Sequence, residues 1–209
     1  MSYPATDDLS LLTEATPRIA RLREHALAIA HRGQDRREGD LAALRSWRSS
    51  SAEQSHLVRR GLMARDILCA LTPVIGDDEL IVGNWANRPL NAEEAQEFDF
   101  LQREVAPAMS RVDGQRSHMS IDYECLLREG VHGLRALIAR YREPLDLARA
   151  EDQQQDDFYR ACLVALDGMT TLAEKYADLA EQSAHDADPA RAEELREIAR
   201  LCRAVPAGP

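Results

Sequence analysis

The sequence predicts a mainly α-helical fold with one or two short strands. Alanine, leucine, arginine and glutamate, which are good helix formers, are abundant among the 209 residues, and aromatic residues make up only 5%. Apolar residues recur every three or four positions along much of the chain, as they do on one face of a helix. The exception is the apolar run of Leu80, Ile81 and Val82, which is bounded by turn residues and predicted to be a strand.

Helix signals also divide the first half of the chain. A helix is predicted over residues 16–33, because Thr16 is a good N-cap, a proline follows it and the apolar periodicity ends at a glycine. A second helix is predicted over residues 40–48. Ser51, with a glutamine three residues later, resembles a capping box, so a third helix is expected to start there. It should end before the turn-like stretch that precedes the predicted strand.

The second half of the chain has the pattern of five further helices. Asn91, with a glutamate three residues later, forms another capping-box pattern at a helix start. A short helix over residues 122–129, closed by a glycine, is followed by a helix over residues 133–149. One long helix is predicted over residues 153–185. The last helix starts at Asp188, which is followed by a proline in the favoured first position.

Charge and hydropathy exclude several classes of protein. The formal net charge is −10, from 26 basic and 36 acidic residues, so the chain repels a phosphate backbone and nucleic acid is not an expected partner. No apolar run is long enough to span a bilayer, and the first 16 residues are polar and acidic, unlike a signal peptide. We therefore expect a cytoplasmic protein with no membrane partner.

The four cysteines, Cys69, Cys125, Cys162 and Cys202, are far apart in the sequence. A zinc site usually has at least one closely spaced cysteine pair, so no metal cluster is expected. Each cysteine lies in an apolar, helix-like context. We interpret them as reduced, packed thiols rather than as a disulfide framework.

The lone predicted strand bears on domain organisation, because one strand cannot form a sheet by itself. Either it pairs with a segment elsewhere in this chain, or its partner belongs to a missing part of the protein. We expect residues 1–15 to be a flexible tail. Residues 16–209 are expected to form a single helical domain that is incomplete.

An ordered set of sequence phrases runs from about residue 16 to residue 206, and the phrase over residues 79–84 is its most specific piece. The phrases lie at residues 16–24, 57–68, 75–84, 118–130, 158–161, 175–180 and 194–206. Together they resemble the N-terminal region of the pyruvate formate-lyase-like glycyl radical enzymes. This family includes glycerol, propanediol and hydroxyproline dehydratases and choline trimethylamine-lyase.

The resemblance implies a fold and a chemistry. The implied fold is an α/β barrel, of which this chain would be the multi-helix N-terminal portion, forming outer helices and part of the wall of the substrate cavity. The family's chemistry, in anaerobic metabolism, passes a radical from a glycine to a cysteine, whose thiyl radical attacks a small polar substrate. A partner activating enzyme, which uses S-adenosylmethionine and an iron–sulfur cluster, installs the glycyl radical.

The sequence departs from the family at the residues that carry this chemistry. The family's radical motif reads roughly Arg-Val-x-Gly-Tyr, its cysteine loop reads roughly Gly-Cys-Val or Gly-Cys-Ala, and neither occurs here. None of the four cysteines follows a glycine, so none is assigned the thiyl role. We therefore expect no catalytic residue, cofactor or metal in this chain, and no activity from it alone.

Two residues are candidates for substrate binding. In family members a histidine in a phrase like that of His118 faces the substrate cavity, and an imidazole can hydrogen-bond a hydroxyl or protonate a leaving group. The family's usual glycine before it is here Ser117. Asn84 would be a polar group at the end of the predicted strand. The alternatives are a surface histidine and a turn-forming asparagine.

Other functions remain open at this point. A stand-alone helical module derived from this family could bind a protein partner or regulate a full-length enzyme. A metal hydrolase built on His118 and Asp122 is a third hypothesis, although two ligands without a third are weak support. Because a segment of this kind would expose apolar surface, its expected partners are the missing barrel portion or a second copy of itself.

Overall fold

The computed structural model is mostly helical, which confirms the predicted fold class. The residues that it describes are 16–32, 35–52, 54–83, 88–109, 122–206 and 208. Within them, the chain forms seven α helices and one short 3₁₀ helix, and no strand. These are α1 (Pro17–Arg32), α2 (Arg37–Ser49), α3 (His56–Ala70), α4 (Ala92–Glu104), η2 (Ala106–Ala108), α5 (Tyr123–Arg142), α6 (Ala150–Ser183) and α7 (Pro189–Ala204).

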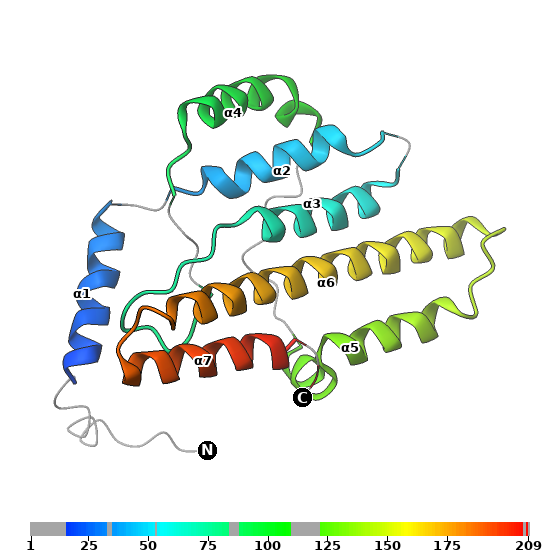
Figure 1. Ribbon diagram of the computed structural model, residues 1–209. Helices are drawn as coiled ribbons and strands as arrows, with labels where there is room; N and C mark the ends of the chain where they lie inside the picture. The colour runs from blue at the N-terminus through cyan, green and yellow to red at the C-terminus, as the bar shows by residue number, and fades with distance from the viewer. Residues whose placement is uncertain are drawn as a thin grey trace, which may run out of the picture.

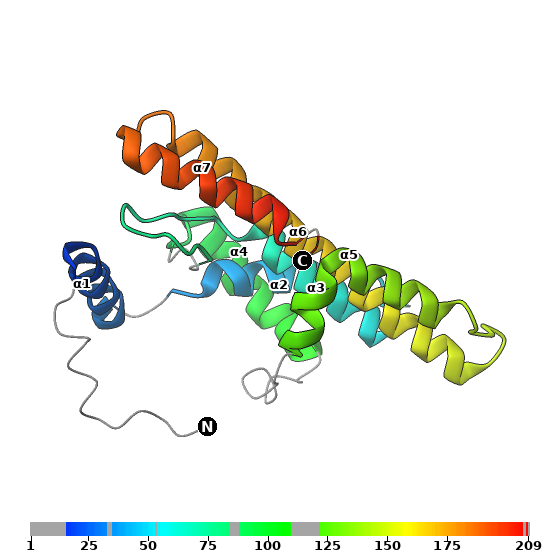
Figure 2. The same ribbon diagram turned by 90° about the horizontal axis from the view of Figure 1, so that it is seen from below.

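The helices lie side by side in a stack with α6 near its centre (Figure 1). Helix α6 packs against α3, α5 and α7, while α2 packs on α3 and α4 packs on α2. Helix α1 runs across the end of this stack and stands apart from it in both ribbon views (Figures 1 and 2). No helix in the described part of the chain combines the length and the apolar character needed to cross a bilayer.

Local capping confirms most of the predicted helix starts. Asn91 Oδ1 accepts a hydrogen bond from the backbone N–H of Glu94, and the Glu94 carboxylate accepts one from the backbone N–H of Asn91, both at 2.9 Å. Asp188 caps α7 as predicted. The start of α3 was predicted wrongly, because its N-cap is Ser55, whose hydroxyl accepts from Val58 N, rather than Ser51.

The main core lies between α6 and α7 and is built largely from small side chains. Alanines such as Ala177 and Ala180, both fully buried, allow the two helices to approach closely, and Leu195 and Ile198 fill the space between them. A second cluster joins α2 to α4 through Leu41, Leu44 and Leu101. The fold is thus fixed by packed helix faces in the middle of the stack.

A buried carboxylate fastens the loop after α3 to α2 and α4. Glu38, 6% exposed, accepts hydrogen bonds from the Thr72 hydroxyl at 2.7 Å and from Arg88 Nε at 2.8 Å. Burial favours a higher pKa for Glu38, but these hydrogen bonds outweigh it and hold the pKa below its ordinary value. Arg88 also binds Glu94, so one guanidinium links three segments.

Helix α5 contains a kink at the position where the sequence indicated a break. Gly130 has φ 59° and ψ −175°, which is not helical, and it separates two helical pieces. The kink brings the backbone N–H of Val131 to Pro206 O at 3.1 Å, so the bend in α5 is joined to the segment just after α7. The second piece ends at Arg142 rather than at the predicted residue 149.

The predicted strand at Leu80, Ile81 and Val82 is wrong for the described part of the chain. These residues lie in the loop between α3 and α4, with bends at Leu80 and Ile81. A strand requires a neighbouring strand to pair with its backbone, and the described elements around this loop are helices. The predicted flexible tail over residues 1–15 lies outside the described residues.

Candidate functional site

The two predicted substrate-binding residues, His118 and Asn84, lie outside the described residues, so the structure does not place them. The described residues next to them are well anchored. Asp122, four positions after His118, caps α5 by accepting a hydrogen bond from Cys125 N at 2.9 Å. The described residues include no group of three or more histidine, cysteine or acidic side chains arranged to hold a metal ion.

The loop that leads to Asn84 is held by its own turn and by α6 and α7. Gly76 and Glu79 close the turn with two hydrogen bonds, from Gly76 N to Glu79 Oε2 at 3.0 Å and from Glu79 N to Gly76 O at 3.1 Å. Arg191 of α7 donates to Gly76 O at 2.9 Å. Burial and the nearby Glu79 carboxylate raise the pKa of Tyr176, which is 5% exposed on α6. These hydrogen bonds therefore hold the part of the loop around Gly76 and Glu79 in a fixed position against α7.

Ion pairs connect α1 to this loop and to α7. Arg21 donates to both carboxylate oxygens of Asp78, at 2.7 and 2.5 Å, and Arg18 donates to both oxygens of Glu194, at 2.7 and 2.8 Å. Arg191 also binds Glu194, at 2.8 Å. We call these five residues the α1 clasp. It joins three elements that are distant in the sequence.

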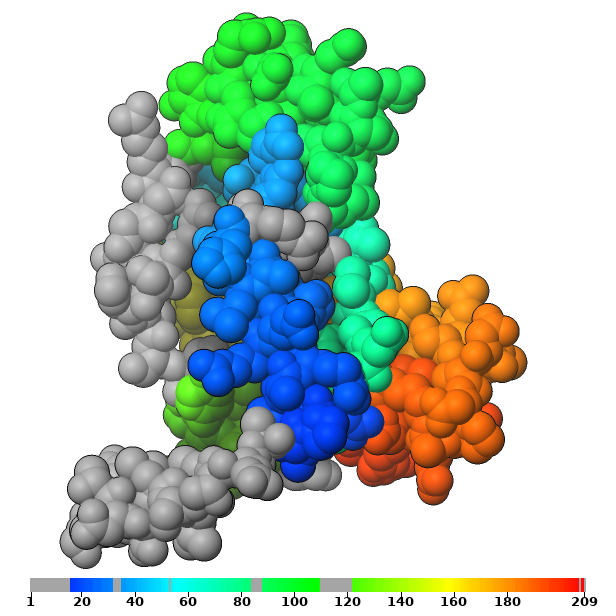
Figure 3. Space-filling model, turned by 90° about the vertical axis from the view of Figure 1, so that its left-hand side faces the viewer, coloured from blue at the N-terminus to red at the C-terminus, as the bar shows by residue number. Residues whose placement is uncertain are grey.

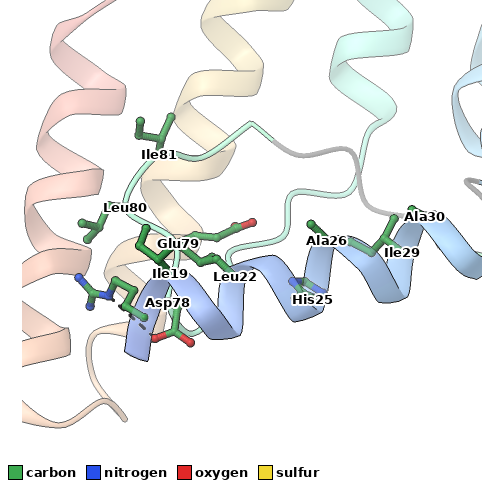
Figure 4. A pocket seen from close by; sticks show the side chains of 11 residues that line it. Ile19, Leu22, His25, Ala26, Ile29, Ala30, Asp78, Glu79, Leu80 and Ile81 are labelled. Atoms are coloured by element: carbon green, nitrogen blue, oxygen red, sulfur yellow. Dashed lines mark ion pairs between the residues drawn. The ribbon is translucent and has the colours of Figure 1, made fainter. Parts of the chain in front are cut away.

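An apolar groove of about 720 Å³ lies between α1 and the loop. Ile19, Leu22 and Ile29 lie on the side of α1 that faces the loop, and Leu80 and Ile81 form the opposite wall (Figure 4). Figure 3 shows α1 in blue on this face of the molecule, beside the loop and the ends of α6 and α7. The groove is lined mainly by apolar side chains, and it is open to solvent.

The α1 clasp is expected to weaken in acid. Hydrogen bonds from Arg21 lower the pKa of Asp78, and hydrogen bonds from Arg191 and then Arg18 lower the pKa of Glu194. A carboxylate with a lowered pKa in the folded protein adds stability above its unfolded pKa, and this stability is lost as the pH falls through the folded pKa. We therefore expect α1 to detach as the pH falls below about 4, the ordinary pKa of a carboxyl group, as measured by backbone carbon chemical shifts.

Two variants of the chain test this prediction, one within the clasp and one outside it. Asp78→Asn should loosen α1 already at neutral pH, whereas Arg200→Ala, which breaks an exposed pair with Glu197 within α7, should leave α1 unchanged. Because the clasp side chains are partly exposed, high salt should act in the same direction as acid. Helical shifts in α1 that persist at pH 2 would contradict the prediction that the clasp holds α1 in place.

Burial affects the four thiols of the chain. All four cysteines are free and partly buried. Burial raises the pKa of the Cys162 and Cys202 thiols, which is the opposite of the change that makes a cysteine reactive. This agrees with the interpretation of the cysteines as packed thiols.

The clasp and the groove were not found by sequence reasoning. The only available signals were arginines three residues apart on the first helix, Arg18 and Arg21, and the paired acidic residues Asp77 and Asp78 in a turn. Nothing in the sequence connects these two short patterns, because their contact depends on how α1 lies against the loop.

Comparison with known proteins gives a family match over the second half of the chain. Residues 110–209 match the pyruvate formate lyase-like family. The chain is 32% identical to (2S)-3-sulfopropanediol dehydratase of Klebsiella oxytoca and 34% identical to isethionate sulfite-lyase of Bilophila wadsworthia, over 44% and 42% of its length. Each match spans only 11% of the relative's length.

Solved structures extend the similarity to nearly the whole chain. A structure on 1,2-propanediol dehydration in Roseburia inulinivorans matches 94% of this chain with a TM-score of 0.74 at 21% identity, and the match covers 30% of that protein. The hydroxyproline dehydratase of Clostridioides difficile matches 93% of this chain with a TM-score of 0.68 at 19% identity, over 31% of its own length. Residues 110–209 therefore resemble the pyruvate formate lyase-like family, and nearly the whole chain shares its fold with part of these solved enzymes, in agreement with the resemblance seen in the sequence.

Proposed function

We propose that this chain is the helical, cavity-wall part of a glycyl radical lyase or dehydratase that acts on a small polar substrate. The observation that carries the proposal is the fold match, with a TM-score of 0.74 over 94% of the chain. The relatives that it matches act on small, highly polar molecules, a sulfonated propanediol and isethionate, according to their names. The substrate class is therefore small and polar, and the individual substrate is left open.

The same proposal holds that the chain is catalytically incomplete by itself. It spans about a third or less of the solved enzymes that share its fold. Its sequence contains neither the radical glycine motif nor a cysteine that follows a glycine. We therefore assign no step of the radical reaction to any residue of this chain, and the activating enzyme would act on the glycine of the complete enzyme.

Within this proposal, His118 and Asn84 contribute to the wall of the substrate cavity. Both residues lie close in sequence to a part of the fold that is held in place. Asn84 comes directly after the loop that the Gly76–Glu79 turn closes, and His118 lies four residues before Asp122, the N-cap of α5. Functional side chains are often carried by loops that a rigid scaffold positions. An imidazole and an amide can both hydrogen-bond the hydroxyl groups of a small polar substrate.

The experiment that tests incompleteness is activation of the purified chain under anaerobic conditions. The chain is mixed with a glycyl radical activating enzyme, S-adenosylmethionine and a reductant, and electron paramagnetic resonance is recorded before 1,2-propanediol, glycerol or isethionate is added. We expect no glycyl radical signal and no product. The complete Klebsiella oxytoca dehydratase with its own activating enzyme is the positive control. A radical signal or turnover from this chain would reject the proposal.

The two site residues are tested by comparing stability with function. A turn-forming asparagine contributes to stability, whereas a cavity residue does not, so Asn84→Ala and His118→Ala are expected to leave thermal unfolding of the chain unchanged. In the complete Klebsiella enzyme, alanine at the positions that correspond to these residues in the sequence is expected to raise KM or lower kcat at least about tenfold. Destabilisation of the chain with unchanged kinetics in the enzyme would assign both residues to the fold.

A further inference from the structure

We infer that Leu80, Ile81 and Val82 form an edge that pairs with a strand of the polypeptide that a glycyl radical enzyme has beyond the part matched by this chain. The apolar face of α1 would cover the side chains of the docked strand. This inference rests on the proposed function and names the surface through which the helical part joins the rest of the enzyme.

The backbone of this segment is available for pairing. The turn hydrogen bonds stop at Glu79, and within the described residues the N–H and C=O groups of Leu80, Ile81 and Val82 make no hydrogen bond. Unpaired backbone groups in an aliphatic, strand-prone segment are a ready template for an added strand. This explains why the sequence signals a strand while the described fold contains none.

The side chains of the segment differ in how far they are covered by the rest of the protein. Val82 packs against the α6–α7 core, while Ile81 is 89% exposed and Leu80 is 50% exposed. Val82 therefore anchors the segment to the protein, and its two neighbours leave large aliphatic groups in water, which costs free energy unless a partner covers them.

The groove beside the segment has room for such a partner and favours an apolar one. The groove between α1 and the loop has a volume of about 720 Å³ and is open to solvent, and its apolar lining includes Ile19 and Leu22 of α1 and Leu80 and Ile81 of the loop (Figure 4). The charged groups Arg18 and Asp78 at its rim are already used by the α1 clasp. The groove therefore recognises aliphatic side chains and a strand backbone rather than a charged ligand.

The similarity to solved enzymes indicates which polypeptide would supply the partner strand. The solved enzymes share the fold of this chain over 30% or 31% of their length, so most of their polypeptide lies outside the matched part. An exposed, strand-prone edge on the matched part is a natural point of contact with that remainder. A second copy of this chain is the competing occupant, and the experiment separates the two.

The experiment compares hydrogen–deuterium exchange in this chain and in the complete Roseburia inulinivorans enzyme. In this chain the amides of Leu80, Ile81 and Val82 should exchange at nearly unprotected rates, while those of α6 are protected. The segment that superposes on them in the complete enzyme should exchange at least about a thousandfold more slowly, as strand amides do. Equal rates in the two proteins would overturn the inference.

A matched pair of lysine variants adds a second readout. Ile81→Lys and Leu147→Lys, both at exposed aliphatic residues, should shift the Tm of this chain by less than about 2 °C. In the complete enzyme, lysine at the residue that superposes on Ile81 should lower Tm by at least about 5 °C or prevent folding, whereas lysine at the Leu147 position should not. An Ile81→Lys effect of the same size in both proteins would contradict the inference.

Light scattering of this chain distinguishes the competing occupant. We expect the segment to be unprotected in a monomer. A dimer that protects Leu80, Ile81 and Val82 and is dispersed by Ile81→Lys would assign the edge to a second copy and overturn the inference. A different result would reject the proposed function, namely a glycyl radical signal or turnover from this chain. That result does not depend on hydrogen–deuterium exchange at Leu80, Ile81 and Val82.

Discussion

Replacing Gly61 and Gly168 together by alanine is expected to lower the free energy of unfolding by about 4 kcal/mol. An added Cβ at Gly61 would lie 2.5 Å from Ala161 O, and one at Gly168 would lie 2.7 Å from Arg65 Cα. Both obstacles are backbone atoms, which cannot rotate away, so α3 and α6 must separate. Overpacking costs about 3 kcal/mol at each site, and the better helix propensity of alanine offsets about 1 kcal/mol of it.

Urea unfolding followed by circular dichroism measures this change. Thr171→Ala is the matched control, because Thr171 is an exposed residue of α6 whose hydroxyl bonds only within its own helix, to Asp167 O. Its effect should stay within about 0.5 kcal/mol. The single glycine variants should each account for about half of the loss. A double variant as stable as the parent would show that α3 and α6 do not meet as closely as described.

The contact between α3 and α6 also explains the expected size of the loss. Helices α3 and α6 share the most extensive helix–helix contact in the described part of the chain. Lys175 of α6 reaches across to the end of α3 and donates to Cys69 O at 2.8 Å and to Leu71 O, which satisfies carbonyl groups that have no partner within the helix. Separating the two helices would break this cap as well.

Gly130→Ala is expected to lower the free energy of unfolding by about 3 kcal/mol. With φ 59° and ψ −175°, Gly130 occupies a region that is essentially restricted to glycine. An added Cβ would also lie 2.6 Å from the Cα of Gly208. Alanine would therefore strain the kink of α5 and displace the segment after α7, including the hydrogen bond from Val131 N to Pro206 O.

Gly76→Ala is the control for this second prediction. Gly76 is a turn glycine without a positive φ, and its added Cβ would lie 3.4 Å from the Glu79 side chain, an ordinary contact distance. It should change stability by less than about 0.5 kcal/mol in the same urea experiment. If both glycine variants are equally stable, α5 can straighten at little cost and the kink is not a fixed feature of the fold.

Some features of the fold could be predicted because they depend on residues close together in the sequence. The capping box of Asn91 and Glu94 and the cap at Asp188 need only three or four adjacent positions. The break in α5 was indicated by a glycine. The start of α3 failed because two serines, Ser51 and Ser55, offer the same local chemistry, and packing of α3 on α2 and α6 decides between them.

Other features could not be predicted because they depend on what lies beside a residue in space. Tyr123 and Tyr176 both occupy apolar helix faces in the sequence, yet Tyr176 is 5% exposed and Tyr123 is 63% exposed. The α1 clasp joins Arg21 to Asp78, 57 residues away, and Arg18 to Glu194, 176 residues away. The roles of His118 and Asn84 stay predictions.

The sequence by itself determined the helical class, most of the caps and the family resemblance, because helix periodicity, caps and family phrases are encoded by neighbouring residues. The tertiary structure decided how close α3 and α6 approach, which helix faces are covered, and that Leu80, Ile81 and Val82 are a loop rather than a strand. The physical reason is that a side chain is buried, and a strand is paired, only when a second segment of polypeptide lies against the first. A strand signal in one segment becomes a strand when another segment is placed beside it.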